Sequence, residues 1–423
     1  MRRSITLTRF RKAFGPGLMW AAAAIGVSHL VQSTRAGAMA GFGLAGVVLL
    51  ALVIKYPFFE FGPRYAAATG LSLVEGYRRI GRWALWLYLG ITLSTALVVQ
   101  VAVVLFTAYL SKLAFGLSWS VPLVAAVLCA ACAAILAAGR FRVLDLVIKV
   151  VMAILAVSTL VAASLALPGA DLSTLSLWPS EALSGAVPLA FVLALMGWMP
   201  SAIDISVWSS LWTLAKDGAS GVRSEPDAVL LDFRIGYVGT GVLAFAFLAL
   251  GAALMYGAGE AFSPRGTEFS GQVIDLYTGT LGSWTRPIVL TAVLTTMFST
   301  TLTVIDGFPR AIDRGVRVAF VDPEGTSSYA GTGVAYWAAI AVLSSLTVLV
   351  LAVLPGSLTK MVDFATIVSF LTAPVLGYLN LRAVTSDSVP PDLKPGRALV
   401  ALAWTGLTVL IGFALIYGFT RLG

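Results

Sequence analysis

Charged and polar side chains lie close together inside one long apolar stretch near the N-terminus. Residues 21–41 read AAAAIGVSHLVQSTRAGAMAG, and the members able to bind a ligand are Gly26, Ser28, His29, Gln32 and Arg35. An arginine inside a membrane span costs at least ~2.5–3.5 kcal/mol unless it faces a cavity or a partner. Because serine, histidine and arginine can all donate hydrogen bonds, this stretch predicts a cradle for a small anion.

A second apolar stretch is interrupted near the middle of the chain. Residues 195–204 read LMGWMPSAID. Pro200 has no backbone N–H and clashes with the carbonyl of the preceding turn, and Gly197 makes local unwinding easy. The side chains that this break would expose are Trp198, Met199, Ser201 and Asp204. The second candidate site therefore offers an indole, a thioether, a hydroxyl and a carboxylate.

The composition indicates a membrane protein. Of 423 residues, 59% are hydrophobic and only 11% are charged, whereas soluble domains average about 25% charged residues. Apolar runs long enough to cross a bilayer predict eleven spans, near residues 17–42, 44–66, 84–112, 121–138, 144–167, 186–212, 235–257, 286–307, 334–354, 361–382 and 398–418. We expect a single transmembrane domain over residues 1–423.

Arginine and lysine are distributed unequally between the predicted loops. The tail of residues 1–15 and the loops on the same side carry most of the basic residues, and the opposite loops carry few. Basic residues accumulate on the cytoplasmic side. This predicts a plasma (inner) membrane protein with a cytoplasmic N-terminus and an external C-terminus. The asymmetry also accounts for the net charge of +8 without a nucleic-acid partner.

The loops leave no place for a soluble catalytic domain. No GxxxxGK(S/T) phosphate loop occurs, and the single histidine forms no set with a nucleophile and an orienting group. We therefore expect no enzyme and no cofactor. The expected partners are the lipid bilayer and a small inorganic ion, with no obligate protein partner evident. The external stretch 260–279, EAFSPRGTEFSGQVIDLYTG, is long enough to form a short lid helix.

The two interrupted stretches fall in the first and the sixth predicted spans. Breaks at corresponding positions predict an inverted repeat of five plus five spans, with repeat one near 17–167, repeat two near 186–382 and an extra helix near 398–418. Discontinuous helices of this kind form ion sites near the bilayer midplane, because freed carbonyls bind cations and half-helix N-termini bind anions. The expected architecture is an all-α polytopic membrane protein.

Four segments resemble the Nramp family or its distant relatives. They are FGPGLMWAAAAIGVSH at 14–29, PRYAAATGLSLVEGYR at 63–78, WMPSAIDISVWSS at 198–210 and SFLTAPVLGYLNLRAV at 369–384. The resemblance runs over most of the chain in order and spacing. It implies a LeuT-type fold with unwound spans 1 and 6, and a secondary transporter, since Nramp proteins import divalent transition metals with protons.

The sequence departs from the family pattern at the residues that bind metal. The family reads Asp-Pro-Gly-Asn where this chain has Gly26, Val27, Ser28 and His29. Its Met-Pro-His motif becomes Met199, Pro200 and Ser201. The third span carries no acid for a proton path, and Arg35 replaces the glutamine that follows the first break. The chain is expected to form a divergent branch of the family that lacks the metal-binding motif.

Two substrate classes follow from these substitutions. The donors of Ser28, His29, Gln32 and Arg35, with free N–H groups near residues 28–30, favour a small anion such as bicarbonate. The alternative is a divalent metal ion, Mn²⁺, Fe²⁺ or Mg²⁺, bound through Met199 and Asp204, with protons as the candidate coupling ion.

A coupling ion is expected beside the first break. LeuT-type transporters that use sodium hold it between the span 1 break and hydroxyls of span 8. The resemblance therefore implies a Na⁺ site from carbonyls near Ile25 and Ser28 together with Ser299 and Thr300; H⁺ is the alternative coupling ion.

Some of these residues have simpler structural explanations. His29 could be a hydrogen-bonded core residue, and Arg35 could pair with an acid such as Asp306. Glu60 and Arg64 stand four apart on a predicted helix and should pair with each other. Lys55 lies deep inside span 2 with no assigned role.

Overall fold

The computed structural model describes residues 16–138, 141–177, 187–258, 262–322, 329, 333–354 and 357–422. Side chains are not described at residues 18, 141–152 and 421–422. The basic tail of residues 1–15, which contributes to the predicted orientation, lies outside the described residues.

Helices account for nearly all of the described chain, and no strand occurs in these ranges. Each predicted span has a helical counterpart. The uninterrupted ones are α4 (Ala45–Thr69), α6 (Arg82–Phe115), α7 (Val121–Ala137), α8 (Phe141–Ala166), α12 (Pro226–Leu254), α14 (Arg286–Phe320), α15 (Val334–Val353), α16 (Leu358–Thr385) and α17 (Arg397–Leu422). The prediction of an all-α membrane fold is confirmed.

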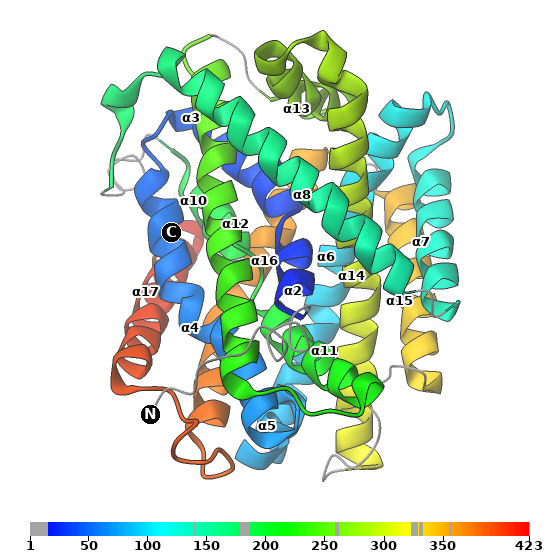
Figure 1. Cartoon of the computed structure of the whole chain (residues 1–423), viewed down its shortest axis with the longest axis vertical. Coiled ribbons are helices and arrows are strands. Elements are labelled where there is room, and N and C mark those ends of the chain that lie inside the picture. The colour runs from blue at the N-terminus through cyan, green and yellow to red at the C-terminus, as the bar shows by residue number, and fades with distance from the viewer. Residues whose placement is uncertain are drawn as a thin grey trace.

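Spans 1 and 6 are each divided into two helical parts, as the sequence predicted. Span 1 consists of α2 (Pro16–Ala24), a π-helical turn η1 (Ser28–Ser33) and α3 (Thr34–Ala40). Span 6 consists of α10 (Leu189–Trp198) and α11 (Asp204–Ser220). Figure 1 shows these half-helices in the middle of the molecule, with α7 and α15 at one edge and α17 at the other.

Short helices occupy the connections. Helix α5 (Leu73–Ile80) follows α4, and α13 (Gly266–Leu281) lies at the opposite end of the molecule in Figure 1. Helix α13 confirms that the stretch after span 7 contains a short helix, over residues 266–281. Single 3₁₀ turns occur at η2 (Leu167–Gly169), η3 (Leu172–Thr174) and η4 (Ser283–Thr285).

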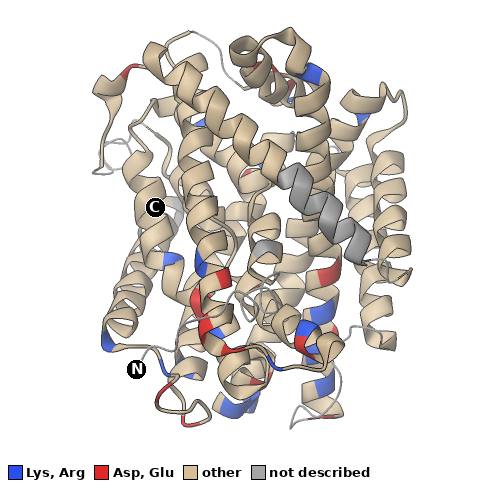
Figure 2. Ribbon diagram, in the orientation of Figure 1, with Lys and Arg blue, Asp and Glu red and all other residues tan. Residues whose placement is uncertain are grey.

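Seven helices in the described part of the chain are long and apolar enough to cross a membrane. Some of the other apolar helices, such as α7 and α10, are shorter, so the total of eleven spans stays a prediction. Charged residues are concentrated at the end of the molecule that carries α5, as Figure 2 shows. That distribution agrees with the uneven loop charges, whereas the orientation of the termini stays a prediction.

Candidate functional site

The break in span 6 is five residues long. Helix α10 ends at Trp198, residues 199–203 are not helical, and α11 begins at Asp204. The glycine before this break packs directly on a neighbouring helix: a Cβ atom at Gly197 would lie 2.0 Å from the carbonyl oxygen of Thr366. The close approach fixes the end of α10 against α16 and leaves several backbone carbonyls without helical partners.

A lysine from α4 binds these carbonyls. The Nζ atom of Lys55 donates hydrogen bonds to the carbonyl oxygens of Met196 at 3.0 Å, Gly197 at 2.9 Å and Ser201 at 2.7 Å. The side chain is fully buried. Lys55, which had no assigned role in the sequence, therefore belongs to the span 6 break.

A carboxylate stands at the other side of the same break. Asp204 is the first residue of α11, where the positive end of the helix dipole favours a negative charge. It is 2% exposed, and neither of its oxygens has a hydrogen-bond partner within 3.5 Å. The span 6 break thus holds a cation at the carbonyl end of α10 and an acid at the amide end of α11.

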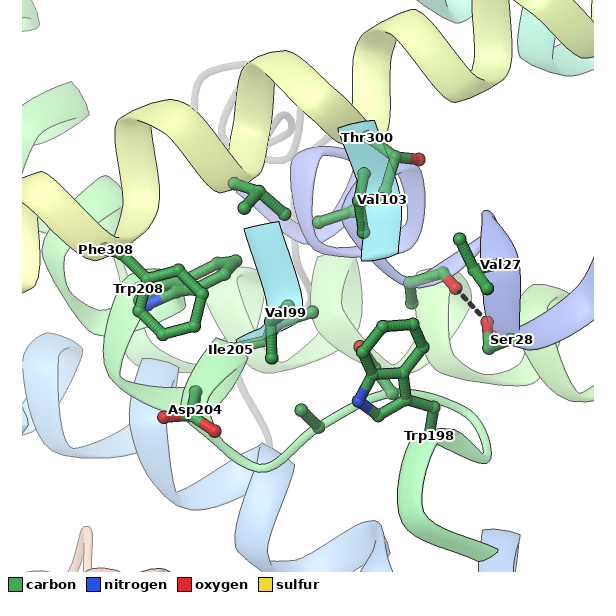
Figure 3. Close-up of a pocket in the computed structure, with 15 residues that line it drawn as sticks. Val27, Ser28, Val99, Val103, Trp198, Asp204, Ile205, Trp208, Thr300 and Phe308 are labelled. Atoms are coloured by element: carbon green, nitrogen blue, oxygen red, sulfur yellow. Dashed lines mark hydrogen bonds between the residues drawn. The ribbon is translucent and has the colours of Figure 1, made fainter. Parts of the chain in front are cut away.

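Asp204 lines a small cavity between the two broken spans. The polar lining consists of Asp204, Ser28, Ser201, Thr300 and the indoles of Trp198 and Trp208; the rest is apolar and comes mainly from α2, α6, α11 and α14. Figure 3 shows Asp204 at one end, near Trp208 and Phe308, with Ser28 and Thr300 toward the other. The volume of about 30 Å³ is enough for one or two water-sized particles.

The break in span 1 is much shorter and is closed by neutral hydrogen bonds. Only Ile25 and Gly26 leave the helical path. The N–H groups of His29 and Leu30 donate to the Gly26 carbonyl at 3.1 and 2.9 Å. The expectation that these groups are free to hold an anion was therefore wrong, because η1 resumes hydrogen bonding immediately after the bend.

His29 is held by hydrogen bonds at both ring nitrogens. Its Nδ1 lies 2.7 Å from the Ser28 hydroxyl oxygen, and its Nε2 lies 2.9 Å from the Thr240 carbonyl oxygen on α12. The Ser28 hydroxyl also contacts the Ala24 carbonyl at 2.5 Å. The ring is fully buried and is not among the residues lining the cavity. These contacts anchor η1 to α2 and α12.

Arg35 forms an ion pair with Asp363 on α16, and the suggested pairing with Asp306 was wrong. The guanidinium donates to both carboxylate oxygens, at 2.7 and 3.1 Å, and to the Gln32 amide oxygen at 3.1 Å. It also lies over the Phe191 ring at 4.8 Å. Asp306 instead accepts from Arg310 on its own helix at 2.7 Å. Both acids are remote from Arg35 in the sequence, Asp363 by 328 positions, so only the packing of the helices selects the partner.

One hydroxyl of span 8, that of Thr300, lies beside the first break. The Thr300 Oγ1 atom lies 3.4 Å from the carbonyl oxygens of both Ala22 and Ile25. The Ser299 hydroxyl is buried and makes no hydrogen bond. A Cβ atom at Gly26 would lie 2.7 Å from Thr300 Oγ1, so glycine permits this approach.

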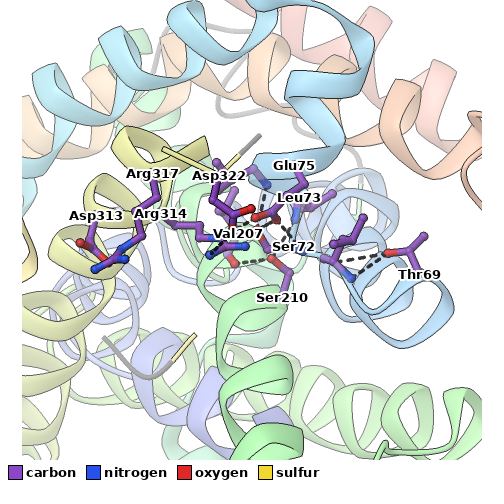
Figure 4. Close-up of polar contacts among 12 residues, drawn as sticks. Thr69, Ser72, Leu73, Glu75, Val207, Ser210, Asp313, Arg314, Arg317 and Asp322 are labelled. Atoms are coloured by element: carbon purple, nitrogen blue, oxygen red, sulfur yellow. Dashed lines mark hydrogen bonds and ion pairs between the residues drawn. The ribbon is translucent and has the colours of Figure 1, made fainter. Parts of the chain in front are cut away.

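Near α5, polar and charged side chains join α5 to α11 and α14, as Figure 4 shows. The Leu73 N–H donates to the Ser210 hydroxyl at 3.2 Å, which joins α5 to α11. Glu75 accepts from Arg314 on α14 and from the Ser72 N–H, the latter at 2.8 Å. The Glu75 and Arg314 side chains are 1% and 3% exposed, whereas those of Asp363 and Arg35 are 28% and 13% exposed. The Glu75–Arg314 ion pair is therefore better shielded from water than the Asp363–Arg35 ion pair.

The predicted site residues divide into two groups. Ser28, Trp198, Ser201, Asp204 and Thr300 line the cavity, whereas Gly26, Ile25, His29, Gln32, Arg35, Met199 and Ser299 do not. Among the described residues, no three His, Cys, Asp or Glu side chains come together as a metal site.

From the sequence alone, Lys55 had no assigned role and Asp363 was not identified as the partner of Arg35. A lysine in mid-span was itself a signal, by the same energetic reasoning applied to Arg35. The expected pairing of Glu60 with Arg64 is confirmed at 2.5 Å.

Comparisons with known proteins agree with this architecture. A family model described as natural resistance-associated macrophage protein-like (Nramp) matches residues 17–420. An uncharacterized protein of Pasteurella multocida is 34% identical over 409 residues, covering 96% of this chain and 91% of that protein.

Solved structures of transporters share the fold. A crystal structure of the Eremococcus coleocola manganese transporter, a single-site mutant, superposes with a TM-score of 0.74 at 15% identity, covering 99% of this chain and 88% of that one. MhsT in complex with L-phenylalanine matches with a TM-score of 0.58 at 15% identity, covering 97% and 98%. At these identities the likeness concerns the fold alone, which is of the LeuT type.

Proposed function

The chain belongs to the Nramp family of membrane transporters, and we propose that it carries a small, hard divalent cation, with Mn²⁺ or Mg²⁺ as the first candidates. The supporting observation is Asp204, whose two buried oxygens have no hydrogen-bond partner at the edge of the cavity. An ionised carboxylate buried without a partner is costly, and a cation in the cavity removes that cost.

The donor types around the cavity favour hard cations. The polar groups able to bind an ion there are the Asp204 carboxylate and the hydroxyls of Ser28, Ser201 and Thr300. Oxygen ligands suit Mg²⁺ and Mn²⁺, whereas softer ions prefer nitrogen or sulfur. The Met199 side chain is buried outside the lining, so its thioether does not support a softer ion. A single carboxylate leaves one positive charge of a divalent ion uncompensated. Mg²⁺ in particular keeps several of its water ligands in such sites. The name of the Eremococcus neighbour adds support for manganese.

The anion hypothesis receives less support from the contacts. Asp363 already compensates the charge of Arg35, and both ring nitrogens of His29 have protein partners. Bicarbonate would have to displace these partners and also approach Asp204. It remains a separate hypothesis that the same transport assay tests.

The proposal is tested by uptake into proteoliposomes that contain the full chain. We expect saturable Mn²⁺ uptake that Mg²⁺ inhibits and Cd²⁺ inhibits only weakly. Asp204→Asn should lower it at least ~100-fold, because removing one partner of a buried ion pair costs about 3–5 kcal/mol. The control is Asp171→Asn, which changes an exposed loop acid. A bicarbonate-driven change of internal pH without any Mn²⁺ flux would overturn the proposal.

For coupling, the contacts of Thr300 support Na⁺. Its Oγ1 atom and the Ile25 and Ala22 carbonyls provide oxygens on two adjacent helices. Uptake should then depend on a Na⁺ gradient and lose that dependence in Thr300→Val. Thr301→Val is a matched control, because Thr301 bonds to Thr107 on α6 instead. Uptake that follows a proton gradient and ignores Na⁺ would assign the coupling to H⁺.

A further inference from the structure

The contacts of Lys55 resemble those of a bound ion more than those of a structural ion pair. We propose that Lys55 is a tethered cation occupying a monovalent-cation site that the backbone carbonyls of Met196, Gly197 and Ser201 form. All three carbonyl oxygens lie between 2.7 and 3.0 Å from Nζ. The side chain reaches them from α4, which is a different helix.

The number of contacts fits the charged form of the lysine. An ammonium group has three N–H donors and no acceptor, whereas a neutral amine has only two N–H donors. Three carbonyl acceptors surround Nζ. Among the residues that the structure describes, no carboxylate lies within 4.0 Å of it. Carbonyl dipoles and the negative end of α10 therefore balance the charge.

Three converging carbonyls form a site for a single positive charge. Rings of backbone carbonyls replace the hydration shell of monovalent ions in channels. The Phe59 ring lies 5.6 Å from Nζ and adds a weak cation–π attraction. Because none of these ligands carries a negative charge, a divalent ion is compensated much less well than an ammonium, K⁺ or Na⁺ ion.

This assignment makes Lys55 a specificity-determining residue for the transporter. While the ammonium binds the carbonyls of the span 6 break, a transported ion cannot use them and is left with Asp204 and the hydroxyls of the cavity. This consequence rests on the proposed function, but the carbonyl site itself does not. The experiment below therefore measures binding without any transport.

The test is chemical rescue of a variant that lacks the ammonium. Lys55→Ala is purified in detergent as the full chain, and its melting temperature is followed by tryptophan fluorescence in chloride salts of equal ionic strength. We expect the melting temperature to fall by several degrees relative to the unmodified protein. Methylammonium, NH₄⁺ or K⁺ should restore part of it saturably. Choline, which is too large for the site, should not.

Matched variants separate this site from a general salt effect. Lys112→Ala removes a lysine at the end of α6 and should show no cation-specific rescue. Lys55→Arg should not substitute for lysine, because a planar guanidinium cannot place its donors on three converging carbonyls. If Lys55→Ala cannot be purified, Lys55→Gln is titrated with the same salts in its place. The glutamine side chain retains two N–H donors.

The test compares how the melting temperature responds to different cations. Rescue by small monovalent cations in a Lys55 variant, absent from the unmodified protein, supports the site even if no metal transport is found. Equal responses of the variants and the unmodified protein to every salt would overturn the proposal. Rescue by Mg²⁺ at least as strong as by K⁺ would also overturn it.

Discussion

The two helix breaks occupy corresponding positions in the fold but are stabilised differently. In span 1, only Ile25 and Gly26 leave the helix, and the polar contacts nearby involve serine, histidine and backbone groups. In span 6, five residues leave the helix, and Lys55 and Asp204 stand at its two sides. A longer break frees more backbone groups, and in a membrane each of them needs a partner. The longer break thus explains why a buried lysine binds free carbonyls at span 6.

Among the substitutions that test this comparison, overpacking the glycines of the two breaks should lower the stability most. At Gly197 an added methyl group meets a backbone carbonyl at 2.0 Å, whereas at Gly26 it meets the rotatable Thr300 side chain at 2.7 Å. Overpacking a well-packed interior costs about 1–3 kcal/mol. We expect Gly197→Ala to reach the upper end of this range and Gly26→Ala the lower end, measured from melting temperatures of the purified variants.

Gly90→Ala is the matched control for both substitutions. No atom lies within 4 Å of a Cβ at this position on α6, and alanine is the better helix former. Its melting temperature should be unchanged or slightly higher. If Gly26→Ala proves as damaging as Gly197→Ala, the first break is as tightly constrained as the second and the comparison fails.

An intermediate effect is expected from His29→Leu. The substitution leaves the Thr240 carbonyl and the Ser28 hydroxyl with one contact fewer, and an unsatisfied buried polar group costs about 1–3 kcal/mol. The melting temperature should fall while Mn²⁺ uptake per folded molecule stays largely unchanged, since the ring does not line the cavity. Phe247→Leu, which changes the ring packed on His29, controls for lost packing. Lost transport at unchanged stability would place His29 at the substrate.

The smallest effect should come from separating Arg35 and Asp363. Both side chains are partly exposed, and solvent screening limits such pairs to about 1 kcal/mol or less. A double-mutant cycle of Arg35→Ala and Asp363→Ala, read as melting temperatures, should give a coupling energy in this range. A coupling energy several times larger would show that this pair is as important to stability as the charges of span 6.

Local sequence patterns predicted the helices and the positions of both breaks. Hydropathy over about 20 residues located the apolar segments, because a bilayer requires that length. Pro200 and Gly197 marked the second break through backbone chemistry alone. The pair of Glu60 and Arg64 was also predictable, since helical residues four apart face each other. All of these inferences depend on neighbours within a few turns.

The partners of the buried charges were not predictable in this way. The sequence suggested an acid such as Asp306 as the partner of Arg35, whereas the actual partner is Asp363 on a different helix. Lys55 binds carbonyls about 140 positions away, and backbone carbonyls leave no trace in a sequence. Which acceptors a side chain reaches depends on how helices rotate and pack against each other.

The sequence by itself determined that this chain forms apolar helices, that the first and sixth are interrupted, and that charged residues lie inside its spans. Those features follow from residue types and short-range geometry. Only the tertiary structure decided that Lys55 would bind the carbonyls of the second break, that Asp204 would line a cavity without a hydrogen-bond partner, and that Arg35 would pair with Asp363. The physical reason is that a buried charge must be balanced by whatever groups the packed helices bring to it.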